Sequence, residues 1–343
     1  MQKTLVQPGG PARNHQAVPR IARSGLGWAF LAVLGVGALF ILGRSLVAKP
    51  TLFVEQIING LQLGFMYALI ALAYTMVYGF VRLLNFAPGD VFMLGALVSY
   101  YAITRYSVNR LPERIFGPMP PALSSLLGTL LVVALSMLVC AFMVAIIERV
   151  AYKPLRNAPR IAALITAIGV SFFLEYFGAL PFVFTSNYVT YQRPLTAASY
   201  EVAGVRFSNI TLIVIATALL ALLLLQWIVL RTKMGKAMRA TSFDKPTARL
   251  MGINIDAIIT FTFVIGASLA AIASVLYAVA YPQIYTFMGI MPGLKAFVAA
   301  VLGGIGSIPG AFVGGLIIGQ AEALSSHALS STLRDAIAFG ILI

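Results

Sequence analysis

Long apolar runs are the feature of this sequence that most limits its fold. A helix needs about 20 mostly apolar residues to cross the hydrocarbon core of a bilayer. Runs of this kind recur along the whole chain of 343 residues, and the candidate spans are residues 26–47, 53–80, 90–104, 121–147, 161–184, 209–230, 256–280 and 308–325. The sequence therefore predicts an all-α, polytopic integral membrane protein with about 8–9 transmembrane helices.

Composition excludes a soluble domain. Hydrophobic residues make up 60% of the chain and charged residues only 10%, whereas a soluble domain carries about 25% charged residues. The net charge of +14 could indicate nucleic-acid binding. The Lys and Arg residues flank the apolar runs, however, which is typical of a membrane protein, so we expect a lipid bilayer and no nucleic acid as the partner.

The lysines and arginines also predict an orientation. Two basic segments, residues 148–160 and 231–255, belong in the cytoplasm by the positive-inside rule, which places residues 185–208 outside. Residues 1–25 are polar and rich in Gly and Pro, as a disordered cytoplasmic tail is. Residues 26–47 are either an extra N-terminal transmembrane helix or a signal-like segment.

The C-terminal part of the chain contains two shorter apolar segments, residues 293–302 and residues 335–343. Residues 293–302 are long enough for half a span, and a Gly- and Pro-rich stretch follows them, so we expect a broken or re-entrant segment near residues 293–310. Residues 335–343 are too short to cross a bilayer. We therefore expect the permease-like part, residues 53–343, to end in a truncated C-terminal helix.

The residue clusters needed for a metal site or for catalysis are missing from the sequence. The two histidines, His15 and His327, have no neighbouring Cys, Asp or Glu at ligand spacing, so no metal site is expected. No phosphate-binding glycine loop of the P-loop type occurs, so no ATP or other cofactor should bind to this chain. The one cysteine, Cys140, lies in an apolar run and is expected to be a packing residue. We expect no enzyme activity.

Polar residues inside the apolar runs are candidates for a substrate pathway. In residues 53–80, Asn59, Tyr67, Tyr74 and Tyr78 fall within about 100° of helical arc, as either a packed polar seam or a pathway lining. Asn85 begins the helix-breaking sequence NFAPGD, which is either a substrate site or an ordinary turn.

Ionisable residues inside a membrane-spanning apolar run are energetically costly and often functional. Glu175, Lys295 and Glu322 lie in or at the edge of apolar runs. A pairing between Lys295 and Glu322 is one possibility, for which the sequence offers no geometry.

Two overlapping G-x-x-x-G pairs occur near the C-terminus: Gly310 with Gly314, and Gly315 with Gly319. Small residues at this spacing allow two helix backbones to approach closely. We expect these glycines to mark tight helix packing, within the chain or at a subunit interface.

The polar segment 235–256 contains the signals of a short helix. Asp244 is a plausible N-cap, Pro246 suits a first turn, and Gly252 suits the end. A helix over residues 245–252 is either an ordinary surface helix or an element that docks into a partner, with the small Ala248 on it.

Several blocks of the sequence resemble the LivH-type permeases of branched-chain amino acid ABC transporters. They occur in the same order as in that family: residues 59–79, 83–90, 148–171, 235–256, 261–278 and 293–326, of which the last, GLKAFVAAVLGGIGSIPGAFVGGLIIGQAEALSS, is the most specific. The family has NFAHGE where this chain has NFAPGD, so Pro88 and Asp90 differ from it. Its members usually continue past the position of Ile343.

The resemblance implies a type II importer-like helical bundle in the bacterial inner membrane. It would translocate branched-chain amino acids together with a second, homologous permease of the LivM type, two ABC ATPase subunits and a periplasmic substrate-binding protein. In the family the region around Asp244, Ala248 and Gly252 docks in a groove on the ATPase. Related members carry urea, short amides or other amino acids, and a secondary transporter without an ATPase is a further alternative.

Overall fold

The computed structural model describes residues 50–81, 85–156, 158–195, 197–328 and 333–340. The predicted tail 1–25 and the apolar run 26–47 lie outside these residues. The long helices are α2 (Pro50–Val81), α3 (Pro88–Thr104), α5 (Pro121–Ile147), α6 (Arg160–Gly178), α7 (Asn209–Arg231), α10 (Ile255–Ala280) and α12 (Ile308–Ala328). The shorter ones are η2 (Val108–Arg110), α4 (Leu111–Phe116), η3 (Glu148–Tyr152), α8 (Lys233–Phe243), α9 (Lys245–Leu250), α11 (Ile290–Leu302) and α13 (Leu333–Gly340).

The described helices confirm a polytopic all-α bundle. Six of them are long and apolar enough to cross a membrane, and a seventh span is counted if α3 and the bent segment Val108–Phe116, at 59° to each other, form one crossing. The prediction of about 8–9 spans also included residues 26–47, which the structure does not describe. The predicted span 161–184 is shorter in the structure, because α6 ends at Gly178, three residues before the helix-breaking Pro181.

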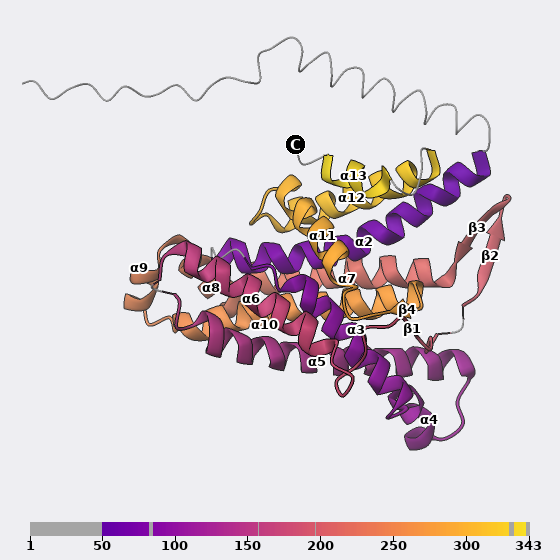
Figure 1. Cartoon of the computed structure of the whole chain (residues 1–343), viewed down its shortest axis with the longest axis horizontal. Helices are drawn as coiled ribbons and strands as arrows, with labels where there is room; N and C mark the ends of the chain where they lie inside the picture. The colour runs from indigo at the N-terminus through magenta and orange to yellow at the C-terminus, as the bar shows by residue number, and fades with distance from the viewer. Residues whose placement is uncertain (1–49, 82–84, 157, 196, 329–332, 341–343) are drawn as a thin grey trace, which may run out of the picture. The chain divides into compact units, whose positions relative to one another are not determined.

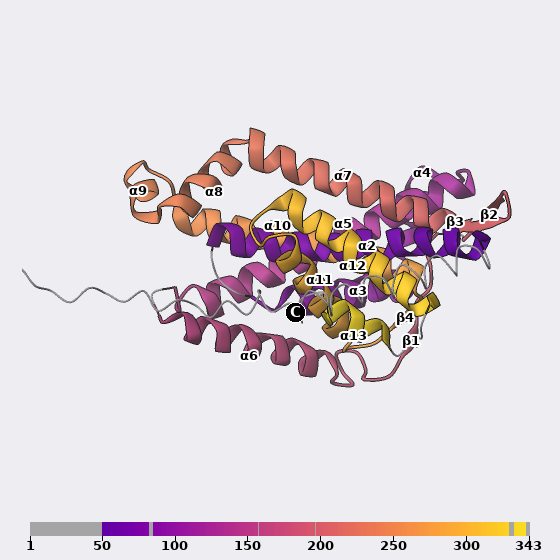
Figure 2. The same ribbon diagram turned by 90° about the horizontal axis from the view of Figure 1, so that it is seen from above.

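Helix α2 lies at the centre of the bundle. It packs against α7, α10, α11 and α12, and every residue from Gly64 to Val77 is buried. Figure 2 shows α7 and α6 on opposite sides of the layer that holds α2, α10 and α12. A helix enclosed on all sides needs no polar face, which explains why this stretch is apolar all round.

Helix α7 lies at the periphery and has one buried stripe. Its buried residues recur every three or four positions: Ile210, Val214, Ala218, Ala221, Leu225 and Val229. The opposite face exposes large apolar side chains, among them Leu220, Leu223 and Trp227. In a protein that crosses the membrane such a face is turned to lipid.

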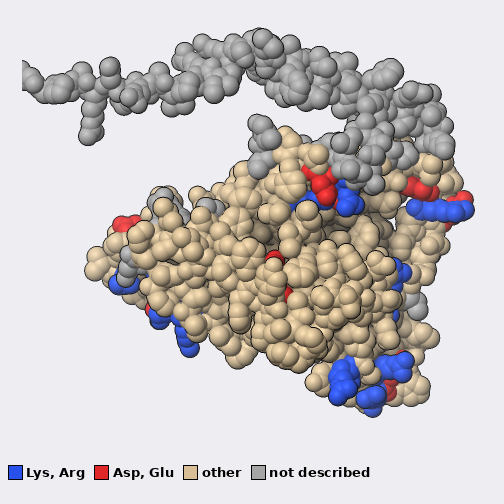
Figure 3. Space-filling view, in the orientation of Figure 1, with Lys and Arg blue, Asp and Glu red and all other residues tan. Residues whose placement is uncertain are grey.

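The bundle has two distinct ends (Figure 1). We call the end with α8, α9 and residues 148–156 and 158–160 the basic end. The opposite end, the hairpin end, carries α4 and two small antiparallel sheets: β1 (Val189–Thr190) with β4 (Gln283–Ile284), and β2 (Ser199–Val202) with β3 (Val205–Ser208). Figure 3 shows most of the visible charged side chains near these ends, with mostly uncharged surface between them apart from a few acidic atoms near the middle.

The β2–β3 hairpin was not predicted from the sequence. It turns at Ala203 and Gly204, with φ values of 52° and 78°, the left-handed conformation of a tight hairpin turn. Its four-residue strands lie in a segment without long apolar runs, and the length of apolar runs predicts membrane helices but not a short hairpin.

The predicted break near residues 293–310 is confirmed. Helix α11 ends at Leu302 and α12 begins at Ile308. Between them Gly304 and Gly306 have φ values of 87° and 101°, a region that glycine enters without steric cost. The start of α11 meets the first turn of α3, where a Cβ on Gly289 would lie 2.1 Å from the carbonyl oxygen of Gly89.

Candidate functional site

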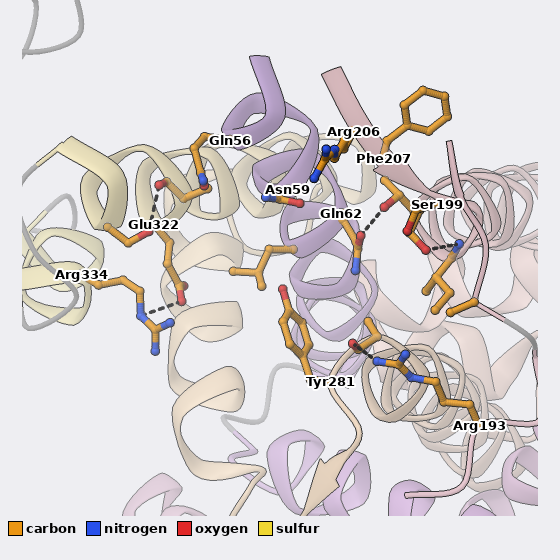
Figure 4. A pocket seen from close by; sticks show the side chains of 18 residues that line it. Gln56, Asn59, Gln62, Arg193, Ser199, Arg206, Phe207, Tyr281, Glu322 and Arg334 are labelled. Carbon is orange, nitrogen blue, oxygen red and sulfur yellow. Dashed lines mark hydrogen bonds and ion pairs between the residues drawn. The ribbon is translucent and has the colours of Figure 1, made fainter. Parts of the chain in front are cut away.

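The hairpin end holds an open cavity of about 540 Å³. Three amides, Gln56, Asn59 and Gln62, follow one face of α2 at three-residue spacing and line one wall (Figure 4). The remaining walls come from α7, the β2–β3 hairpin, the C-terminal end of α10, α12 and α13. We call this space the polar cavity.

The polar cavity borders a partly buried cluster of charged side chains. The Lys295 Nζ atom lies 2.9 Å from Glu322 Oε2 and 2.7 Å from Asp335 Oδ1. The Arg334 Nε atom lies 3.1 Å from Glu322 Oε1, and the Tyr67 hydroxyl donates to Glu322 Oε2 at 2.8 Å. The side chains of Lys295 and Glu322 are only 2% and 3% exposed. We call these five residues the ion cluster.

The ion cluster is balanced in charge, with two cations and two carboxylates. Burying an isolated charge is very costly, but paired and hydrogen-bonded charges offset that cost. The pairs join α11, α12 and α13, and Tyr67 adds α2. The cluster therefore fixes four helices around one edge of the polar cavity.

The structure distributes the five predicted pathway residues along α2 and the segment after it. Asn59 lines the polar cavity, and Tyr67 is buried in the ion cluster. Tyr74 is buried and donates to the Phe86 carbonyl oxygen at 3.3 Å. Tyr78 is 36% exposed. The structure thus brings the first two together and leaves the next two nearer the basic end.

Asn85 is held by local hydrogen bonds. Its Oδ1 atom accepts from the Ala87 N–H at 3.0 Å and from the Tyr152 hydroxyl at 2.8 Å. The first contact is the turn motif that asparagine side chains commonly form. These contacts are those of an ordinary turn, and a role for Asn85 in the substrate pathway stays a prediction.

Sequence reasoning missed several residues of this site. The cavity residues Gln56, Gln62, Tyr281, Arg193, Arg206 and Arg334 were not singled out. The spacing of Gln56, Asn59 and Gln62 carried a usable signal, because three amides share one helix face. Arg334 and Tyr281 reach the cavity from helices far apart in the sequence, so no local pattern could group them.

The basic end is tied together by ion pairs. Arg156 pairs with both Glu148 and Asp256, and Lys153 Nζ lies 2.8 Å from Asp256 Oδ2. Thr260 donates to Glu148 at 2.7 Å. These contacts place residues 148–160 and the start of α10 at the same end, as the predicted topology requires.

The predicted short helix is present as α9. Asp244 is its N-cap and accepts from the Thr247 hydroxyl. Gly252 ends it with a φ of 78°, and the Gly252 and Ile253 N–H groups close the last turn on the carbonyls of Arg249 and Ala248. This is the glycine-terminated helix end that the sequence indicated.

The side chain of Ala248 faces into the fold and is only 4% exposed. A direct contact of Ala248 with a partner, as the resemblance implied, therefore does not fit its position. Three large apolar side chains of this region face outward among exposed polar ones: Phe243, Leu250 and Met251 are 92%, 86% and 77% exposed. They lie among Lys and Arg residues beyond the ends of the spans, and we call these three the apolar platform.

The four glycines of the G-x-x-x-G pairs lie at close helix crossings. A Cβ on Gly310 or Gly314 would lie 1.9 Å from Gly303 O or 2.1 Å from Ala299 O. These two glycines thus face the end of α11. A Cβ on Gly315 or Gly319 would lie 2.5 Å or 2.2 Å from an α2 backbone atom. The pairs serve packing within the chain on two faces of α12.

A second buried acidic contact lies between α3 and α6. Ser171 donates to Asp90, and Glu175 is buried on the same helix as Ser171. In the part of the chain that the structure describes, no three His, Cys, Asp or Glu side chains gather in a way that could hold a metal ion.

The comparisons with known proteins agree with this architecture. The family model described as branched-chain amino acid transport system / permease component matches residues 56–343. The chain is similar to the high-affinity branched-chain amino acid transport system permease protein LivH of Escherichia coli (strain K12), at 42% identity over 305 residues that cover 85% of this chain and 92% of that protein.

Two further relatives extend the comparison. The permease protein BraD of Pseudomonas aeruginosa is 39% identical over 300 residues, covering 85% of this chain and 92% of its own length. The probable permease protein LivH of Methanocaldococcus jannaschii is 29% identical over 266 residues, covering 77% and 78%. None of the solved structures matches the chain.

Proposed function

The chain belongs to the branched-chain amino acid transport permease family, and from this premise we propose that it carries leucine, isoleucine and valine through the inner membrane as one subunit of an ATP-driven importer. The family is one of transport permeases rather than enzymes. The bundle of spanning helices fits a multi-pass inner membrane protein.

The observation that carries the ATP-driven proposal is the apolar platform. Phe243 ends α8 and Leu250 ends α9, with Met251 directly after it, so all three side chains project from polar segments at the basic end. Large apolar side chains that face neither lipid nor the protein core mark a contact with another protein. A stand-alone secondary transporter has no need of such a surface, whereas a permease driven by separate ATPases must contact them.

The partners follow from the family. ATPase subunits and a substrate-binding protein act with permeases of this type, and ATP would be bound by the ATPases. We propose that α9 is the coupling element: Asp244 and Gly252 fix its two ends, Ala248 anchors it to the fold, and the apolar platform makes the contact. A second, homologous permease of the LivM type would complete the membrane part.

The substrate is tested by competition. In cells that lack other leucine transporters, expression of the chain with its partner subunits should give uptake of labelled leucine that excess isoleucine and valine suppress. Urea and acetamide test the alternative substrates of the same family. If urea or acetamide suppresses the uptake while isoleucine and valine do not, the substrate is urea or a short amide rather than a branched-chain amino acid.

A further inference from the structure

More cations than carboxylates line the polar cavity. Its walls contain three arginines and one acid: Arg193, Arg206, Arg334 and Glu322. Both carboxylate oxygens of Glu322 already have partners in the ion cluster. An anion that enters the cavity therefore meets guanidinium groups and no carboxylate that is free to repel it.

Arg334 is the best placed of the three arginines to bind an anion. Its Nε atom lies 3.1 Å from Glu322 Oε1 and 3.5 Å from Asp335 Oδ1, while the side chain stays 46% exposed. Among the described residues its two terminal amino groups have no hydrogen-bond partner. A guanidinium held in this way presents a planar pair of donors that matches a carboxylate.

The other two arginines are less suited to the task. Arg193 donates to the carbonyl oxygen of Ala280 at 3.2 Å. Arg206 lies on the β2–β3 hairpin, is 74% exposed and pairs with Glu201. Exposed pairs of this kind contribute little because solvent screens them.

Neutral acceptors line the cavity beside Arg334. Figure 4 shows the Tyr281 hydroxyl pointing into the space between Glu322 and Gln62, with Asn59 on the adjacent α2 wall. Amide oxygens and a phenol can accept hydrogen bonds from an ammonium group. Leu63, Ile210 and Ala280 supply apolar wall.

We propose that the polar cavity is a weak binding site on the permease itself for the incoming zwitterionic amino acid. Arg334 binds the α-carboxylate, Tyr281 and Asn59 accept from the α-ammonium group, and the ion cluster positions Arg334. The inference rests on the proposed function, and it deepens that function by adding a recognition step after release from the binding protein.

A series of three ligands tests the proposed binding site on the wild-type chain. Binding of leucine, leucinol and 4-methylpentanoate is measured to the purified permease–ATPase complex without binding protein. Leucine should bind, and leucinol, which lacks the carboxylate, should bind about tenfold more weakly or worse, as expected for a lost charge-assisted hydrogen bond. Equal binding of leucine and leucinol, or no leucine binding, overturns the proposal.

A variant and a matched control test the assigned residue. Arg334→Gln should weaken leucine binding about tenfold, whereas Arg206→Gln in the same cavity should change it by less than about twofold. Arg334→Lys keeps the charge and should be intermediate. Membrane abundance and ATPase activity stimulated by the binding protein report on folding and assembly.

Three outcomes separate this inference from its alternatives. If Arg334→Gln weakens binding-protein affinity but leaves leucine binding unchanged, Arg334 belongs to the docking surface and the inference is wrong. If ATP-driven leucine uptake is present but the complex shows no carboxylate-dependent binding, the inference fails while the proposed function stands. Absence of leucine uptake in the complete wild-type system counts against the function itself.

Discussion

Lys295 shows how a residue can be predicted as important while its role stays hidden. A lysine inside an apolar run is costly and demands a partner, and the sequence indicated Glu322 as one candidate. The structure adds Asp335 at 2.7 Å and Tyr67 on Glu322. The full set could not be predicted, because its members come from four helices whose packing brings them together.

The first prediction concerns this pair. Lys295→Met leaves the buried Glu322 with the Tyr67 hydroxyl and, among the described residues, Arg334 as its one remaining cation. This should cost about 3–5 kcal/mol of stability, the range for breaking a buried ion pair. The expected result is a lower membrane abundance and a lower unfolding temperature of the purified protein.

The control is a double variant. In Lys295→Met with Glu322→Gln the remaining charges, Arg334 and Asp335, still balance and lie 3.5 Å apart. The double variant should therefore be more stable than Lys295→Met alone. If the destabilisation of the double variant equals the sum for Lys295→Met and Glu322→Gln alone, the two residues are not coupled.

At the scale of elements, the contact of α12 with its neighbours depends on glycine. A leucine at Gly314 would collide with Ala299 O of α11, where even a Cβ has only 2.1 Å. Gly314→Leu should lower the amount of folded, assembled permease. Gly169, on α6, has no atom within 4 Å of a Cβ position, so Gly169→Leu is the matched control.

The measurement is the amount of folded protein by fluorescence-detected size exclusion. A normal amount for Gly314→Leu would contradict the close crossing of α11 and α12. An equal loss for both variants would mean that bulk anywhere in the bundle is harmful and that the crossing is not special.

The next prediction concerns α9 and the apolar platform. Leu250→Ser with Met251→Gln should leave insertion normal, because both side chains are exposed, yet reduce co-purification of the ATPase and ATP-driven uptake by about tenfold or more, as for loss of apolar anchors at an interface. Phe182→Ser, an equally exposed apolar residue outside the basic end (79%), is the control.

Because Ala248 is buried, a bulky substitution at this position is not a clean test of α9. Ala248→Trp would overpack the chain's own fold, at a cost of about 1–3 kcal/mol, and a loss of transport would then be ambiguous. The double variant at Leu250 and Met251 avoids that problem. Full uptake with the ATPase still bound in that variant would remove α9 from the mechanism.

The sequence predicted elements better than their arrangement. Apolar length located most of the spanning helices, and caps and glycines located α9 and the break after Leu302. The hairpin and the bend after α3 carry no such signal. The polar cavity could not be predicted as a unit, because its walls come from elements separated by more than 250 residues, from Gln56 to Arg334.

At the scale of the whole molecule, the orientation in the membrane can be measured. The native cysteine, Cys140, is buried, so single cysteines placed at exposed positions report their own side. Phe243→Cys should be shielded from a membrane-impermeant maleimide in intact cells, and Tyr200→Cys should react with it. Labelling of both from the same side would contradict the topology derived from the basic residues.

The central claim is that this chain moves branched-chain amino acids with energy from ATP hydrolysed by its partners. The direct measurement is leucine accumulation in proteoliposomes that contain the chain, its ATPases and second permease, with binding protein outside and ATP inside. The account predicts accumulation against a gradient that stops when the ATPase is inactivated by substitution. Accumulation that persists with the inactive ATPase and follows an ion gradient would contradict it.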